Sequence, residues 1–237
     1  MQSKHGVCLF FLLALLASGT ADGQAHQNSE AELRLRIVSS AAGANRPVPA
    51  VIWLEALPGT PALRSVPNGP YTLLQKNRTF TPHLQVIPVG SVVWFPNADP
   101  FFHNVFSLFE GKRFDLGLYE AGSSKSVTFS REGVSYIFCN IHPEMSAVVV
   151  ALSTPLYAIA DAKDSIVLIH IPPGDYRLHL WIEGVPQPVL DGLGRTVHFP
   201  PRLVDLGAVR APIARQKMTN HANEFGEPYD ADRQTPY

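Results

Sequence analysis

The sequence has only two cysteines, and the first, Cys8, lies in a segment with the features of a cleaved export signal. This segment, residues 1–25, has a basic start, a short apolar core and small residues that suit a signal peptidase. We therefore expect cleavage after Ala21 or Ala25 and export to the periplasm. The mature chain then keeps one cysteine, Cys139, which excludes an intramolecular disulfide.

Long apolar runs and an excess of charge are also missing. The apolar core of the signal, Val7 to Leu16, is shorter than the roughly 20 residues that a membrane-spanning helix needs, so no span is expected after cleavage. Charged residues make up 16% of the chain, and the formal net charge is -1. This balance gives no electrostatic reason to expect nucleic acid as a partner.

Sustained helical periodicity is absent as well, and the pattern predicts an all-β protein. Its 21 prolines and 17 glycines separate short runs that are rich in β-branched and aromatic residues. The runs are densest in residues 71–152, which predicts a β-sandwich. Residues 26–70 and 153–210 contain further alternating strands, and the polar residues 211–237 predict a flexible tail.

The stretch FCNIHPEM, residues 138–145, places Cys139, His142 and Met145 close together. Thiolate, imidazole and thioether groups bind soft transition metals, and His103 in the segment DPFFHNVFS supplies a second imidazole. Two histidines and a cysteine with a weak axial methionine are the ligands of blue copper centres. Each residue alone is more often a packing or surface residue, but the four together favour a copper site.

Several motifs in residues 71–152 resemble those of plastocyanin-like cupredoxins, and the cysteine-containing loop resembles that of the amicyanins most. The motifs are F-x-P at Phe80 to Pro82, V-x-x-x-G from Val86 to Gly90, W-F-x-N at Trp94 to Asn97, D-x-x-x-H-N-V at Asp99 to Val105, and C-x-x-H-P-x-M at Cys139 to Met145. The resemblance implies a cupredoxin Greek-key β-sandwich with one type-1 copper site.

The same resemblance assigns roles to individual residues. It implies that His103, Cys139 and His142 are the equatorial copper ligands and that Met145 is the axial ligand. Asn104 matches an asparagine behind the ligands that ties the two ligand loops together and keeps the site rigid. The alternative for Asn104 is an ordinary turn residue.

Three further histidines are not expected to bind the metal. His83 departs from the family pattern, and we predict it to be a surface residue of the strand FTPHLQVIPVG. His170 and His179 lie in alternating strands outside residues 71–152, and we expect them to be structural or solvent-facing.

The flanking segments carry a weaker resemblance of their own. GANRPVPAVIWLE and DAKDSIVLIHIPPGDYRLHLWIE resemble parts of a carboxypeptidase-regulatory or transthyretin-like β-sandwich. If residues 26–70 and 153–210 form one smaller sandwich, the copper domain is inserted within it, which surface loops permit. The whole arrangement resembles exported bacterial proteins labelled methylamine utilisation protein, a label that describes an association and not an activity.

Three classes of function fit these patterns: an electron carrier, a copper enzyme, and a copper-binding or structural module of the cell envelope. Multicopper oxidases place histidines beside the type-1 cysteine, whereas Phe138 and Asn140 flank Cys139. We therefore expect an electron carrier that is not an enzyme. The alternative is a copper-binding module without a redox partner, or an accessory protein of an amine-oxidising system.

The resemblance also predicts where electrons leave the site. His142 would be the ligand nearest the surface, facing a redox partner protein such as a cytochrome or a dehydrogenase. Phe101 and Phe102 precede His103 and are candidates for an apolar docking rim, with core packing as the alternative for one of them.

Overall fold

The computed structural model of the protein describes residues 30–39, 47–108, 111–212, 223 and 225. Within these ranges the chain forms seventeen strands and one short helix, α1 (Gln187–Leu193), which confirms the predicted all-β class. No helix in the described ranges is long and apolar enough to span a membrane. The predicted signal, residues 1–25, and most of the predicted tail, residues 211–237, lie outside the described residues.

Ten consecutive strands build one sandwich, here called the inserted sandwich. They are β3 (Tyr71–Thr72), β4 (Leu74–Lys76), β5 (Thr79–Thr81), β6 (Leu84–Pro88), β7 (Val92–Pro96), β8 (His103–Ser107), β9 (Phe114–Tyr119), β10 (Ser124–Thr128), β11 (Gly133–Phe138) and β12 (Ser146–Leu152). One sheet has the order β10-β7-β3 and the other the order β6-β12-β11-β8-β9, while β4 and β5 form a hairpin.

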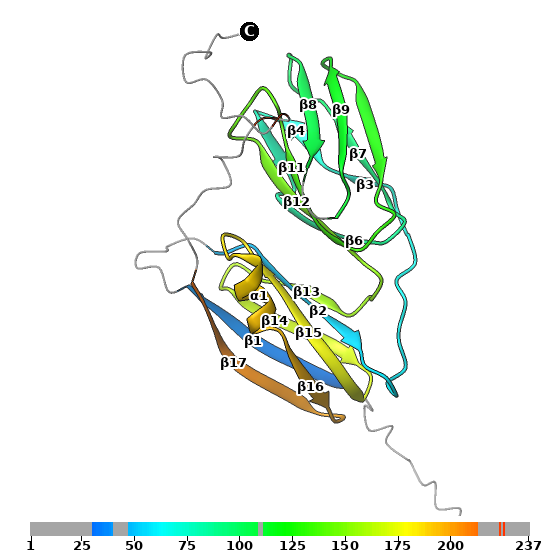
Figure 1. Ribbon diagram of the computed structural model, residues 1–237, viewed down its shortest axis with the longest axis vertical. Helices are drawn as coiled ribbons and strands as arrows, with labels where there is room; N and C mark the ends of the chain where they lie inside the picture. Colours follow the sequence, from blue (N-terminus) through cyan, green and yellow to red (C-terminus); the bar gives the residue numbers. More distant parts are fainter. Residues whose placement is uncertain (1–29, 40–46, 109–110, 213–222, 224, 226–237) are drawn as a thin grey trace, which may run out of the picture.

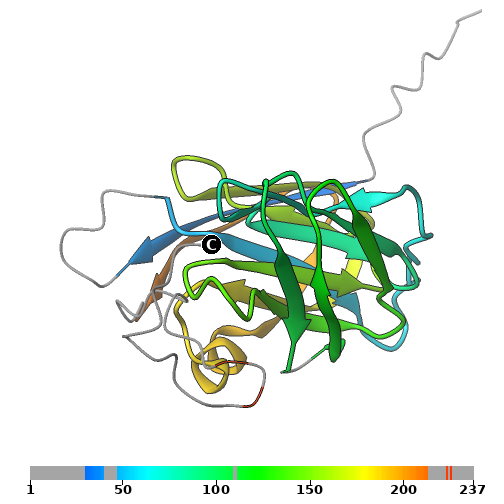
Figure 2. The ribbon, with the colours of Figure 1, turned by 90° about the horizontal axis from the view of Figure 1, so that it is seen from above.

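The strands on either side in the sequence build a second sandwich, here called the flanking sandwich. They are β1 (Ala31–Ser39), β2 (Ala50–Ala56), β13 (Tyr157–Ile159), β14 (Ser165–Ile171), β15 (Gly174–Ile182), β16 (Arg195–Phe199) and β17 (Leu203–Ala211). Their sheets have the orders β14-β1-β17 and β13-β2-β15-β16. The inserted sandwich lies above the flanking one in Figure 1, and the two overlap in the perpendicular view of Figure 2.

The alternation predicted for strands in residues 26–70 is present in β1. Leu33, Leu35 and Ile37 are buried, whereas Arg34 and Arg36 are exposed. Because successive side chains of a strand point to opposite faces, this pattern turns one face of β1 toward the core of the flanking sandwich. The strand pairs antiparallel with β14 and parallel with β17.

Strand β12 is buried on both faces, and it separates the two hydrophobic cores. The side chains on one face of β12 pack against the hydrophobic core of the flanking sandwich. They are Val148, Val150 and Leu152. The alternate set, Ala147, Val149 and Ala151, packs in the core of the inserted sandwich. A strand without polar alternation is the pattern that burial on both faces requires. The two sandwiches therefore share packing through this strand.

A polar contact also crosses between the sandwiches. The buried indole of Trp181, on β15, donates a hydrogen bond of 3.1 Å to the hydroxyl of Tyr136, on β11. Buried indole N–H groups normally need such a partner, so this bond helps to fix how the two sandwiches pack.

Two details differ from the sequence prediction. The segment FTPHLQVIPVG is not one strand, because β5 ends at Thr81 and β6 begins at Leu84, with Pro82 between them. Proline cannot donate a ladder hydrogen bond, which explains the interruption. Helix α1 was also not predicted; it is only seven residues long and buries one side chain, Leu190, which is too short a pattern to recognise.

Candidate metal centre

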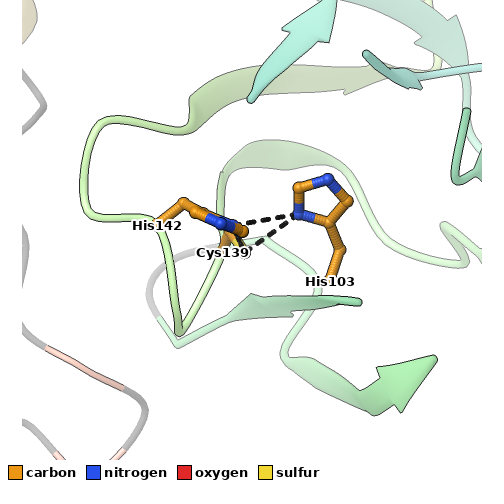
Figure 3. A group of neighbouring side chains, drawn as sticks. All are labelled: His103, Cys139 and His142. Atoms are coloured by element: carbon orange, nitrogen blue, oxygen red, sulfur yellow. Dashed lines mark hydrogen bonds between the residues drawn. The ribbon is translucent and has the colours of Figure 1, made fainter. Parts of the chain in front are cut away.

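Three predicted ligands, His103, Cys139 and His142, meet at one end of the inserted sandwich. His103 is the first residue of β8, Cys139 directly follows β11, and His142 lies in the loop that leads to β12. The sulfur of Cys139 is 3.6 Å from Nδ1 of His103 and 3.5 Å from Nδ1 of His142, and the two nitrogens are 3.1 Å apart. Figure 3 shows the two imidazole rings turned toward each other and toward the sulfur.

This triangle of ligand atoms has the size that a transition metal needs. The point equidistant from the three atoms lies about 2 Å from each, and imidazole nitrogens and thiolate sulfurs bind divalent metals at roughly 2.0 to 2.3 Å. The ligand atoms of these three residues form the group that could hold a metal ion within the described part of the chain. The residues therefore fit a trigonal metal site.

The loop between Cys139 and Met145 is closed by its own backbone. The N–H of Met145 donates to the carbonyl of His142 at 3.0 Å, and the N–H of Cys139 donates to the carbonyl of Met145 at 3.4 Å. Met145 is fully buried in the same core as Cys139. This position is compatible with the predicted axial role of Met145, which stays a prediction.

Backbone amides surround the sulfur of Cys139. Burial raises the pKa of the Cys139 thiol above its ordinary value, and hydrogen bonds from the backbone N–H groups of Asn104, Ile141 and His142 oppose that increase. These amides favour the thiolate, which is the form that binds a metal. The Asn104 amide belongs to β8, so it links the His103 segment to the cysteine loop.

The side chain of Asn104 contacts the neighbouring strand β9. Its amide nitrogen donates to the carboxylate of Asp115, on β9, at 2.7 Å. The side chain therefore braces β8 against β9, and the contact with the cysteine loop is made by the Asn104 backbone. A role of Asn104 in keeping the ligands rigid stays a prediction.

Asp99 also belongs to the site, although its place in the D-x-x-x-H-N-V motif gave it no predicted role. Its carboxylate accepts a hydrogen bond of 2.8 Å from Nε2 of His103, and both side chains are buried. A proton held on Nε2 leaves Nδ1 of His103 without one, and Nδ1 is the atom that faces Cys139 and His142. Carboxylates commonly fix metal-binding histidines in this way.

The turn between β4 and β5 holds the Asp99 carboxylate in place. The N–H groups of Asn77 and Arg78 donate to its two oxygens at 2.6 and 3.0 Å. Burial raises the pKa of Asp99, but the bonds from Arg78, His103 and Asn77 outweigh it and keep that pKa below its usual value. Asp99 is thus ionised at neutral pH, as an acceptor for the His103 proton should be.

Both imidazoles are neutral at physiological pH. Burial, followed by the neighbouring ring of His103, lowers the pKa of His142 to about 4. Burial also lowers the pKa of His103, against the opposing influence of Asp99. Since only a neutral imidazole nitrogen binds a metal, the folded chain presents both imidazoles in the competent form.

The two phenylalanines before His103 occupy different positions. The ring of Phe101 lies 5.3 Å from the ring of His103 and 5.4 Å from that of His142, measured between centroids. Phe101 is half-buried, whereas Phe102 is 55% exposed. Phe101 therefore packs on the ligand rings, whereas the Phe102 side chain is exposed to solvent.

The remaining histidines lie away from the three ligand atoms. His170 is exposed and pairs with Glu30, and His179 stacks on Trp53 and pairs with Glu55. His83 lies just before β6 and not within a strand, and it is half-buried against two polar partners. The sequence did not reveal this position because one of those partners, Glu183, is 100 residues away.

We expect Asp99→Asn to weaken metal binding about 10- to 100-fold, because the neutral amide holds the His103 proton less firmly. The measurement is a competition titration with a chelator of known affinity. The matched control is Asp175→Asn, since Asp175 forms a similar 2.9 Å pair with His198 on the exposed surface of the flanking sandwich. Native affinity in the Asp99 variant would contradict the role of this carboxylate.

Comparisons with known proteins reach only part of the chain. No family model and no curated protein matches it. A purple cupredoxin from Nitrosopumilus maritimus is 24% identical and covers 35% of this chain and 99% of its own, with a TM-score of 0.32. A reduced tryptophan-to-tyrosine variant of amicyanin is 21% identical over 37% of this chain and 86% of its own, with a TM-score of 0.34.

The amicyanin of Paracoccus versutus gives a similar result. It is 22% identical and covers 37% of this chain and 85% of its own, with a TM-score of 0.33. The similarity to these cupredoxins extends over little more than a third of the chain. The resemblances of the flanking segments stay predictions.

Proposed function

We propose that this chain is an exported type-1 copper protein that carries single electrons, with copper bound by His103, Cys139, His142 and Met145. The observation that carries this proposal is the triangle formed by the sulfur of Cys139 and the Nδ1 atoms of His103 and His142, with sides of 3.1 to 3.6 Å. Thiolate and imidazole together favour copper or zinc over magnesium or calcium, and the trigonal arrangement favours copper.

The surroundings of the ligands suit electron transfer better than catalysis. Copper bound here would alternate between Cu(I) and Cu(II) and so supply a one-electron redox couple. His103, Cys139 and Met145 are fully buried, whereas His142 is half-buried. Buried ligands leave little room for a substrate, and the His142 ring offers the shortest route from the site to a docked protein. The proposed partner is a redox protein such as a cytochrome or a dehydrogenase.

We further propose that residues 71–152 form the copper domain and that residues 26–70 and 153–210 form the domain into which it is inserted. In the described residues, strands β3 to β12 pair only with one another, and the remaining strands pair only among themselves. The export signal and cleavage after Ala21 or Ala25 belong to the same proposal, on the evidence of the sequence pattern alone.

The test is titration of the purified protein with Cu(II), followed by stopped-flow mixing of the reduced form with an oxidised soluble cytochrome. We expect one copper per chain, an intense visible band, and oxidation of the site by the cytochrome without consumption of any substrate. A colourless complex would exclude a type-1 site. A coloured site that exchanges no electrons would support the alternative of a copper-binding module.

We expect Met145→Leu to keep copper within about tenfold of the native affinity but to raise the reduction potential, because an axial thioether is a weak ligand that tunes the potential. Leucine has nearly the same volume, so the buried position stays filled. The measurement is a redox titration of the visible band. Loss of all copper binding would show that Met145 contributes more than an axial contact.

A further inference from the structure

His83 connects the flanking sandwich to the strand that follows the metal-binding loop. Its Nε2 lies 2.6 Å from a carboxylate oxygen of Glu183, directly after β15, and its Nδ1 lies 3.1 Å from the carbonyl of Ser146. Ser146 is the first residue of β12 and directly follows Met145. Of the ion pairs in the described ranges, the pair of His83 and Glu183 is the one that joins the two sandwiches.

The two partners of His83 determine its protonation state. A carbonyl oxygen and a carboxylate oxygen can only accept hydrogen bonds, and a neutral imidazole has only one N–H to donate. Both contacts are hydrogen bonds only if the ring is an imidazolium. The bond to Glu183, against the opposing effect of burial, raises the pKa of His83. Glu183 is the charged group that faces the ring, and Ser146 contributes a backbone dipole.

The contacts around His83 act on the start of β12 from two sides. The carbonyl of His83 accepts a hydrogen bond of 2.8 Å from the N–H of Val148. Its ring holds the carbonyl of Ser146, and Ser146 pairs with Phe138, the residue before Cys139. The backbone that carries Met145 into β12 is therefore held by His83.

Glu183 is itself fixed to the flanking sandwich. Its N–H donates to the carbonyl of Pro49 at 2.9 Å, and Trp181, two residues earlier, is buried and bonded to Tyr136. A carboxylate held on a rigid strand end constrains a bound imidazolium better than a mobile surface group does. The position of the His83 ring thus depends on how the flanking sandwich packs.

We propose that His83 is a positioning residue: held by Glu183 as an imidazolium, it fixes the start of β12 and with it Met145, and so makes the metal centre depend on the flanking sandwich. The experiment below that uses the copper-loaded protein rests on the proposed function. The metal-free tests do not.

The raised pKa of His83 sets the direction of the pH dependence. The ion pair contributes its full stability below the unfolded-state pKa of about 6.5 and loses it as the pH rises through the higher folded-state pKa. Above that value the neutral ring keeps only one of its two hydrogen bonds. The tie between Glu183 and Ser146 is then broken.

The first experiment is a double-mutant cycle on the metal-free full chain with His83→Gln, Glu183→Gln and both together. Chemical unfolding at pH 6 should show a coupling of about fivefold in the unfolding equilibrium, and at pH 9 the coupling should be smaller, because the ring is then neutral and its ion pair with Glu183 is lost. Because all four proteins contain the same other titrating groups, the pH dependence of those groups cancels in the coupling. A coupling below twofold at pH 6 would overturn the proposal.

The second experiment reads the position of Met145 directly. In the metal-free chain, the NMR signal of the Met145 methyl group, assigned with Met145→Leu, should shift between pH 6 and pH 9 and should do so less in Glu183→Gln. The matched control is Glu55→Gln, because Glu55 pairs with His179 inside the flanking sandwich at 2.9 Å. A stability coupling with identical Met145 signals in the native chain and Glu183→Gln would show that His83 is only structural.

The copper-loaded chain gives the third reading. The reduction potential of Glu183→Gln should differ from the native value at pH 6 and approach it at pH 9, while Glu55→Gln stays native at both. Equal potentials in the native chain and Glu183→Gln at pH 6 would overturn the link to the metal centre. If no variant forms the visible band, the proposed function fails, and the Met145 signal of the metal-free chain still decides the inference.

Discussion

Cys139→Ser should leave a folded protein without the intense visible band expected of the native chain with Cu(II). The band of a type-1 site comes from charge transfer between the thiolate and copper, and a serine hydroxyl supplies no such transition. We expect complete loss of the band and an affinity for copper lower by at least about 100-fold, because a soft anionic ligand is replaced by a neutral oxygen.

The fold should survive this substitution. Serine is smaller than cysteine by little, and the backbone N–H groups of Asn104, Ile141 and His142 that surround the sulfur can donate to the new oxygen instead. The free energy of unfolding should fall by roughly 1 to 3 kcal/mol, which is the cost of a buried hydroxyl with imperfect hydrogen bonds. The matched control is Ala147→Ser, which places a hydroxyl in the same core at a fully buried position that offers no ligand. A coloured Cys139→Ser protein would contradict the assignment of the sulfur.

The part of the site that the sequence predicted is the part that lies in short motifs. Cys139 and His142 are three residues apart, and His103 is the first residue of a strand in a recognisable motif. Asp99 was missed even though it lies four residues before His103. Its importance depends on contacts with Asn77 and Arg78, which come from a hairpin more than 20 residues earlier. The residues next to Asp99 in the sequence do not predict these contacts.

For the fold as well, the sequence predicted individual strands but not the pairing of distant strands. Alternation within residues 26–70 indicated half-buried strands, and β1 is one. Pairings between distant segments, such as β2 with β15, depend on register and packing across more than 100 residues, which no periodicity encodes. His83 shows the consequence, because its partner Glu183 belongs to the other sandwich.

The shared strand β12 leads to the second large expected effect, in Val150→Asp. Val150 is fully buried on the face of β12 that packs in the core containing the flanking sandwich. Burying an unpaired carboxylate there should lower the free energy of unfolding by about 4 kcal/mol or more, which is a large fraction of the stability of a typical domain. The measurement is chemical unfolding of the metal-free full chain, followed by circular dichroism.

The matched control for Val150→Asp is Val167→Asp, the same substitution on β14 at a position that is 49% exposed. A carboxylate in contact with water should change the free energy of unfolding by no more than about 0.5 kcal/mol. Val150→Asp should also abolish the visible band with copper, because β12 directly follows Met145 and packs in the same core as Cys139. If the sandwiches were independent, the variant would loosen the flanking sandwich and keep its colour. A coloured Val150→Asp protein with native-like unfolding of the inserted sandwich would show that its core does not need the flanking one.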